Sequence, residues 1–275
     1  MTSQLLEEIV TPDVSHLVIE DDRPLDNFQT EKQQRLLVEP LYSSWHPESA
    51  FIAAANVGIF SSTTEEGTDP DVFLSLGVTM PADWSQKQNR SYLAWRFGKF
   101  PEVVIEIVSN RQGNELVSRV LEKPSKREIY ARMGIAYYAV FDPLEQIQEA
   151  GQMAGQPLKV FELRGKHYVE LPQPLWMEDA GLGLKLWEGE FEGVPSQWLR
   201  WCDRQGQLIP TGAEERDMER QGREIERQGR EIERQGREVE RQRAESERQR
   251  AESERQRADR LAEHLRAIGV NPDEI

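Results

Sequence analysis

The sequence predicts a mixed α/β (α+β) domain, in which helices pack on a central sheet, followed by a long charged helix. All seven tryptophans lie within the first 210 of the 275 residues, as expected of one folded core. Within that part, short apolar segments typical of strands alternate with segments of helical spacing. From residue 211 onward a seven-residue repeat of helix-forming residues replaces them.

The predicted elements of the domain follow one another along the chain. Thr30 is expected to cap a helix that runs toward Trp45. Apolar runs bounded by turn residues predict strands at residues 51–60, 71–78, 102–109 and 137–141, and a hairpin at 159–163 and 168–171. Residues 126–133 are expected to form a helix that stops at Gly134.

The repeat in the tail has a coiled-coil-like period but a thin apolar stripe. Apolar side chains occupy one heptad position, at Met218, Ile225, Ile232 and Val239. A stable seam needs two apolar positions per heptad. Pairs such as Glu226 with Arg230 and Glu233 with Arg237 add a few tenths of a kcal/mol each to the helix. Two interpretations stay open: a solvated single helix, or a helix over residues 213–268 that pairs weakly with a copy of itself or with a partner.

The charge and composition exclude several classes of protein. The chain carries a formal charge of −15, of which −3 falls on residues 211–275 and −12 on the first 210 residues. Such an acidic domain argues against a protein that coats nucleic acid by charge alone. No apolar run is long enough to cross a bilayer, the N-terminus lacks the features of a signal peptide, and the single Cys202 cannot form an internal disulfide. We therefore expect a cytoplasmic protein with no membrane partner.

The candidate chemistry lies in two acids that stand in apolar surroundings. Glu106 interrupts a run of buried-type residues, and Asp71 opens an apolar strand. A buried carboxylate costs several kcal/mol unless it is paired or binds a cation. Two such acids on one sheet could hold Mg²⁺, and Lys126, at the start of a short helix, could steady a phosphate. The alternative is structural: Asp71 caps a turn and Glu106 pairs with an arginine.

The glycine-rich phosphate loop, the GxSxG elbow and paired metal-binding histidines are missing from the sequence. The four histidines are scattered, and we expect them on the surface. Cys202, between Trp201 and Asp203, is expected to be a packed thiol.

The order of motifs resembles the Uma-two family of restriction-endonuclease-like proteins in the PD-(D/E)XK nuclease superfamily. The motifs are Pro70-Asp71, the segment PEVVIEIVSN around Glu106, and KREIYARMGIAYYAVFDP. A heptad-rich tail is also usual among the cyanobacterial members. The resemblance implies a restriction-endonuclease-like mixed central sheet flanked by helices over residues 21–212. An N-terminal extension would precede it at 1–20, and the helical tail would follow at 213–275.

The resemblance also implies a site. Asp71, Glu106 and the main-chain carbonyl of Ile107 would hold Mg²⁺, with Mn²⁺ as a substitute. The superfamily commonly has its lysine two residues after the acid, where this sequence has Val108. Lys126, which matches a KxxxY pattern with Tyr130, would replace that lysine. Arg119 is a second candidate for the basic residue, and Asp26 or Glu31 for a further acid.

The function implied is a metal-dependent endonuclease that hydrolyses DNA phosphodiester bonds. DNA would be the partner, and a homodimer would allow two strands to be cut. The alternative is a catalytically inactive nuclease-fold scaffold that acts through its C-terminal helix. A sugar hydrolase with two carboxylates is less favoured, because nothing in the sequence places an aromatic such as Trp84 or Trp95 beside the acids.

Overall fold

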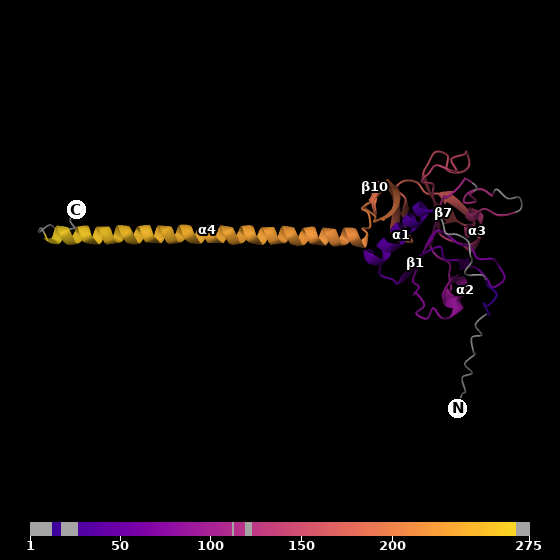
Figure 1. Ribbon diagram of the computed structural model, residues 1–275, viewed down its shortest axis with the longest axis horizontal. Coiled ribbons are helices and arrows are strands. Elements are labelled where there is room, and N and C mark those ends of the chain that lie inside the picture. Colours follow the sequence, from indigo (N-terminus) through magenta and orange to yellow (C-terminus); the bar gives the residue numbers. More distant parts are fainter. Residues whose placement is uncertain (1–12, 18–26, 112, 119–122, 268–275) are drawn as a thin grey trace, which may run out of the picture. The chain divides into compact units, whose positions relative to one another are not determined.

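The structure is a computed structural model that describes residues 13–17, 27–111, 113–118 and 123–267. The chain divides into two compact units, residues 1–213 and residues 214–275 (Figure 1). Most of the predicted N-terminal extension lies outside the described residues.

A six-stranded mixed sheet forms the centre of the first unit. Its strands, in spatial order, are β1 (Phe51–Ala55), β3 (Val72–Leu76), β5 (Val103–Ile107), β6 (Tyr137–Phe141), β7 (Leu158–Arg164) and β8 (His167–Glu170). Neighbouring strands are antiparallel, except that β5 and β6 run parallel. This confirms the predicted mixed central sheet.

Alternation along the strands divides the core between the two faces of this sheet. Val103 and Ile105 of β5 belong to a buried cluster that also holds side chains of α1 (Phe28–Ser43). Val104 belongs to a second cluster, with Tyr130 of α3 (Lys126–Met133). The two helices therefore cover opposite faces (Figure 1). By the same alternation, Glu106 shares the face of Val104, as the sequence predicts.

A three-stranded antiparallel sheet, absent from the sequence-based prediction, packs on the far side of α1. It consists of β9 (Trp176–Met177), β10 (Leu182–Phe191) and β11 (Val194–Cys202). The indole N–H of Trp201 donates to the carbonyl of Leu37 at 2.7 Å. The amide of Gln33 bonds both main-chain groups of Leu199, at 2.8 and 2.9 Å. These bonds attach α1 to the hairpin of β10 and β11.

The predicted strand over residues 51–60 is two strands in different sheets. β1 ends at Ala55, and Asn56 takes a positive φ of 52° that turns the chain. Residues Ile59–Phe60 form β2, which pairs in parallel with β4 (Tyr92–Leu93). A short 3-10 helix (Lys87–Asn89) and α2 (Ala94–Phe97) flank β4. The sequence of residues 51–60 does not indicate this break, because the run is apolar and contains neither a proline nor paired glycines.

The helix ends follow local capping chemistry. Asn27, not Thr30, caps α1: its side-chain oxygen accepts from the N–H groups of Gln29 and Thr30 at 3.0 and 3.1 Å. The predicted bounds of α3 and β6 are confirmed, and Gly134 ends α3 with a φ of 82°. The other predicted strands differ from the observed ones by a few residues at their ends.

The tail forms one helix, α4 (Gly212–Ala267), of 56 residues. Its apolar stripe is exposed: Ile225 and Ile232 are 69% and 70% accessible. The predicted ion pairs are present, with Glu226–Arg230 at 3.4 Å and Glu233–Arg237 at 3.7 Å. The long helix is thus confirmed, and its pairing stays a prediction.

Among the described residues, no helix combines the length and the apolar character needed to cross a membrane.

Candidate metal and catalytic site

Asp71 and Glu106 lie opposite each other on neighbouring strands. In the antiparallel pair of β3 and β5, Val72 is opposite Ile105. Continuing that register by one residue places Asp71 opposite Glu106. Opposite residues project from the same face, with their Cβ atoms roughly 4.5–5.5 Å apart. The two predicted acids are therefore neighbours at the end of β3.

The carboxylate of Asp71 is 9% exposed and is held from two elements. Its Oδ2 accepts the N–H of Ile107 at 2.6 Å, and its Oδ1 accepts from Nε2 of Gln34 at 3.1 Å. Gln34 is itself fixed by Asn56, through two amide–amide bonds of 3.0 and 3.1 Å. The bond to Ile107 places the main chain of that residue beside the Asp71 carboxylate. Its carbonyl as a metal ligand stays a prediction.

Glu106 is almost completely buried, with 1% exposure. Its Oε1 accepts from the hydroxyl of Tyr130 at 2.6 Å, and its Oε2 from Nζ of Lys126 at 2.6 Å. Both donors come from one face of α3, because residues four apart are neighbours on a helix. Burial raises the pKa of Glu106, and the ammonium and the hydroxyl oppose that rise. The cation that pairs with Glu106 is thus Lys126 rather than an arginine.

Lys126 is placed by the start of α3. Ser125 and Glu128 form a capping box, in which each side chain accepts the main-chain N–H of the other residue. The N–H of Lys126 donates to the carbonyl of Asn114 at 2.8 Å. Burial works against the charge of Lys126, but the carboxylates of Glu106 and Asp71 outweigh it and raise its pKa. The side chain of Lys126 keeps 31% exposure, so the residue that pairs with the buried Glu106 is itself partly accessible to solvent.

Comparison with known proteins identifies the family. The family model described as "Uma2: Putative restriction endonuclease" matches residues 18–188, more than half of the chain. The chain belongs to the Uma2 family. Among solved structures, it is similar to the crystal structure of a putative nuclease belonging to DUF820 from Anabaena variabilis ATCC 29413. The two are 16% identical, with a TM-score of 0.34 over 56% of this chain and 72% of that chain. No curated protein matches the sequence.

The oxygen atoms of the site in this Uma2 chain suit a hard divalent cation. A carboxylate offers about four lone-pair sites, so the two hydrogen bonds to Glu106 leave it able to bind a cation as well. Among the described residues, no group of three or more His, Cys, Asp or Glu side chains is placed so that all could hold one metal ion. Asp71 and Glu106 would therefore need a main-chain carbonyl and water molecules to complete the coordination of a cation, and Mg²⁺ commonly keeps several waters.

A third acid lies close to this site and was not predicted. Glu115, in the loop before α3, is 8% exposed, and burial raises its pKa. It interacts electrostatically with Lys126 and Asp71. Its Oε2 has no hydrogen-bond partner within the described parts of the chain. No sequence pattern distinguishes Glu115, because only the fold of the loop buries it.

The remaining candidates do not reach the site or cannot be placed. Glu31 pairs with Arg35 on the exposed side of α1. Asp26 and Arg119 lie outside the described residues. The residue of α1 that does reach Asp71 is Gln34, which lies on the buried stripe of the helix with Leu37 and Leu41. The sequence shows only that Gln34 precedes Leu37 by three residues on one helix face, and a neutral amide there does not stand out as a site residue.

The histidines and the cysteine lie where they were expected. The four histidines are exposed, at His16, His46, His167 and His264. Cys202 is a buried free thiol, 7% exposed, on β11.

Proposed function

We propose that this Uma2 protein is a metal-dependent endonuclease that hydrolyses DNA phosphodiester bonds. The observation that supports it best is a buried carboxylate, Glu106, opposite Asp71 and 2.6 Å from the ammonium of Lys126. Two acids and a cation at one end of a sheet are the groups that metal-assisted phosphoryl hydrolysis requires. The family description, which names restriction endonucleases, points the same way.

Each residue has a distinct role in this proposal. Asp71, Glu106 and the carbonyl of Ile107 would hold Mg²⁺ or Mn²⁺, which supplies Lewis-acid stabilisation and a more acidic bound water. Lys126 would stabilise the negative charge that builds on the phosphate during attack. Its raised pKa suits a permanent cation better than a proton acceptor. Tyr130 and Gln34 position the two carboxylates.

A catalytically inactive scaffold that acts through α4 is the second candidate. The observation in its favour is that Lys126 and Tyr130 already satisfy Glu106, as they would in a purely structural ion pair. The charge of −12 on the first 210 residues also favours it, since duplex binding usually needs clustered Lys and Arg. The two candidates differ in whether the site binds a divalent cation.

Calorimetric titration with Mg²⁺ and Mn²⁺, together with cleavage of supercoiled plasmid, tests the proposal. A plasmid contains many different DNA sequences, so cleavage can be detected without knowing which sequence the protein prefers. We expect Asp71→Asn and Glu106→Gln to lose cation binding and to cut about 100-fold more slowly or less. Lys126→Met should still bind the cation and cut slowly. Glu192→Gln is the matched control, because Glu192 is an exposed acid in the turn between β10 and β11, where it pairs with Arg35 of α1.

Two outcomes would contradict the proposal. If the protein with both Asp71→Asn and Glu106→Gln cuts as fast as wild type, the site assignment is wrong. If the wild-type protein binds neither cation and leaves plasmid intact, the scaffold function is favoured.

A further inference from the structure

A pocket of about 440 Å³ lies on the same face of the six-stranded sheet as the two acids. The sheet residues that line it are Ile52 and Ala54 of β1 and Phe73 of β3. Ala54 is opposite Phe73, which is in turn opposite Val104. Phe73 is two residues from Asp71, so the two side chains project from the same face of the sheet. Their Cα atoms are about 7 Å apart along the strand.

One turn of the chain contacts both the pocket and the acidic site. The N–H of Asn56 donates to the carbonyl of Asp71 at 3.2 Å, and its side chain holds Gln34. The next residue, Val57, lines the pocket. The pocket and the site therefore adjoin each other.

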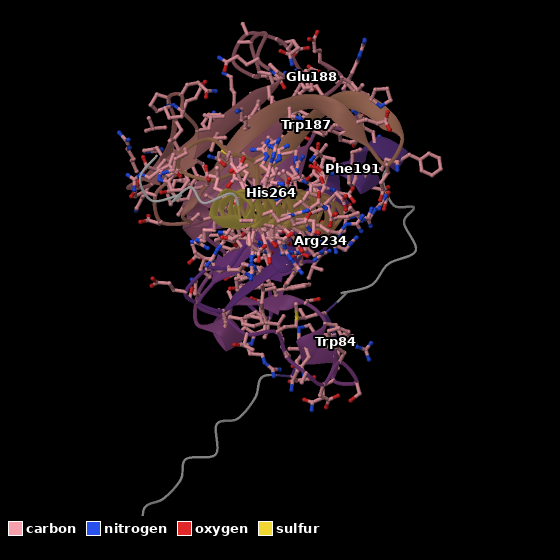
Figure 2. All side chains as sticks on the ribbon, turned by 90° about the vertical axis from the view of Figure 1, so that its left-hand side faces the viewer. Trp84, Trp187, Glu188, Phe191, Arg234 and His264 are labelled. Atoms are coloured by element: carbon pink, nitrogen blue, oxygen red, sulfur yellow. The ribbon has the colours of Figure 1, made fainter. Side chains whose placement is uncertain are left out.

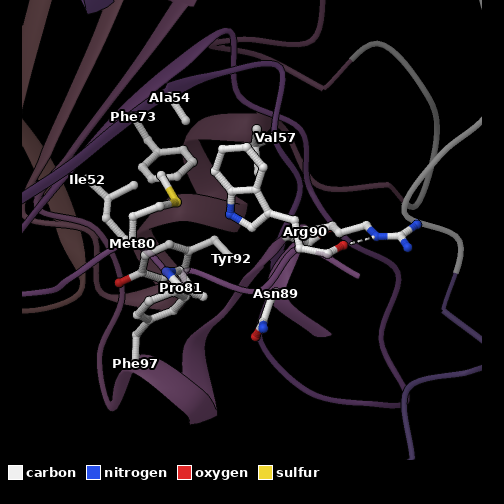
Figure 3. Close-up of a pocket in the computed structure, with 12 residues that line it drawn as sticks. Ile52, Ala54, Val57, Phe73, Met80, Pro81, Asn89, Arg90, Tyr92 and Phe97 are labelled. Atoms are coloured by element: carbon white, nitrogen blue, oxygen red, sulfur yellow. Dashed lines mark hydrogen bonds between the residues drawn. The ribbon is translucent and has the colours of Figure 1, made fainter. Parts of the chain in front are cut away.

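The walls of the pocket are aromatic. Figure 3 shows Phe73, Tyr92 and Phe97 gathered on one side of it. The rings of Tyr92 and Phe97 stack with centroids 4.5 Å apart, and Phe73 meets Tyr92 edge-on at 5.2 Å. A flat ring that enters the pocket would find faces and edges with which aromatic rings pack well.

Trp84 and Met80, which also line the pocket, are unusually exposed for large apolar side chains, at 63% and 42%. Exposed apolar side chains that adjoin a cavity mark a binding site more often than isolated ones do. Arg90 fixes the segment that carries the indole, donating to the carbonyls of Trp84 and Ser85 at 2.9 and 3.0 Å. Trp84 lies well away from Trp187 and Phe191 of the β10–β11 hairpin (Figure 2).

The rings and the charges that line the pocket favour an aromatic occupant over an acyl chain. Its aromatic residues offer ring faces and edges on which a flat ring packs better than a flexible chain does: Phe73, Trp84, Tyr92 and Phe97. None of the described residues that line the pocket is acidic, although the first 210 residues carry −12, and Arg90 adds a positive charge. The volume suits a small ring system.

We propose that this pocket receives one nucleobase, turned out of the stack of the DNA strand whose phosphate lies at Asp71 and Glu106. The inference rests on the proposed nuclease function. The base and phosphate of a nucleotide are joined through a single sugar, which matches a pocket adjoining the acids. Stacking on Trp84 and the aromatic walls would offset the loss of stacking in the duplex.

The test uses the full chain with Ca²⁺ in place of Mg²⁺. Ca²⁺ takes the same oxygen ligands, so the phosphate can still bind at Asp71 and Glu106, but it is a weaker Lewis acid and keeps cleavage slow during the measurement. Fluorescence anisotropy gives the affinity for a labelled duplex with one mismatched pair and for the same duplex fully paired. A mismatched base is easier to turn out, so the wild-type protein should bind the mismatched duplex about tenfold more tightly. Trp84→Ala and the pocket-filling Ala54→Phe should abolish the preference, and Trp84→Phe should keep it. Phe28→Ala, which removes an 89% exposed ring on α1, should also keep it.

The outcomes separate this inference from the proposed function. Equal affinity of the wild-type protein for the two duplexes would overturn the inference, even if the protein cuts plasmid. A preference that Trp84→Ala and Ala54→Phe leave unchanged would overturn it as well. Binding of free deoxyadenosine or of octanoate in the absence of any duplex preference would show that the pocket serves a different ligand. A preference that both variants lose supports the pocket, whether or not the protein cleaves.

Discussion

The burial of Glu106 decides what α3 has to supply. A carboxylate that is 1% exposed between apolar side chains needs donors of its own, because solvent cannot provide them. Lys126 and Tyr130, four residues apart, are the two donors. The KxxxY pattern is therefore explained by the geometry of one helix turn against one strand.

The hydroxyl of Tyr130 should contribute strongly to stability. Tyr130→Phe removes the 2.6 Å bond to the Glu106 carboxylate in a buried place, and we expect a loss of about 1.5–3 kcal/mol in the free energy of unfolding. Tyr168→Phe is the control: its 2.8 Å bond goes to the neutral carbonyl of Ile135, and its loss should cost about 0.5–1.5 kcal/mol. Urea unfolding measures both. Equal losses would show that Tyr130 does not stabilise a charged group.

At the residue scale, the sequence reveals charges in apolar runs and little else. Asp71 and Glu106 stand out because each occupies a strand whose neighbours are apolar. Lys126 stands out because it opens the next helix. Gln34 and Glu115 do not stand out, because a neutral amide on a helix face and an acid in a loop become important only when the fold buries them.

At the scale of elements, local signals set some boundaries and tertiary packing sets others. The bounds of α3 were predictable because Ser125 caps it and Gly134 ends it. The bounds of β10 were not predictable, because Lys185, Glu188 and Glu190 interrupt its apolar residues. Lys185 lies on one face of the strand and Glu188 and Glu190 lie on the other, so neither face shows an uninterrupted apolar pattern. Pairing with β11 over nine residue pairs stabilises this strand.

The turn between β10 and β11 is linked to α1 by charge. Glu192 accepts from Lys32 at 2.7 Å and from Nη2 of Arg35 at 2.6 Å. Hydrogen bonds from Arg35 and then Lys32 lower the pKa of Glu192 from 4.5 to about 2. A lowered pKa in the folded state means that the pair stabilises the fold fully above pH 4.5, and that this contribution disappears as the pH falls through about 2.

The pH dependence of unfolding should show this contribution. We compare the stability of the wild-type protein with that of Glu192→Gln across this range. The wild type should be the more stable protein above pH 4.5, by a modest amount because the pair is on the surface, and the difference should shrink as the pH falls toward 2. Parallel curves would show that the pair contributes nothing to folding.

At the scale of the whole molecule, the two units differ in how they are stabilised. Residues 1–213 contain both buried clusters of the central sheet, whereas none of the described residues from 214 onward is buried. The tail depends on local helix propensity and on ion pairs between residues three or four apart. The sequence alone indicates this division into two units, because every tryptophan precedes residue 211 and the seven-residue repeat follows it.

Removal of residues 214–275 should therefore leave the first unit folded. We expect the truncated chain to keep the Tm and the cation affinity of the full protein, measured by calorimetry. A drop in Tm of several degrees would show that the tail stabilises the first unit. Sedimentation of both forms tests the predicted pairing of the tail: a dimer that becomes a monomer on truncation would assign the contact to α4.

Gln33 and Gln34 give α1 a property that neither amide has alone. Consecutive residues of a helix point about 100° apart, and here one holds Leu199 of the hairpin while the next holds Asp71. The helix can therefore sit in only one rotation about its own axis. Deleting Arg35 would rotate both amides by about 100° relative to the buried Leu37 and Leu41, and would turn them away from their partners at once. The angle between Gln33 and Gln34 on α1 therefore fixes the orientation of the three-stranded sheet relative to the six-stranded sheet.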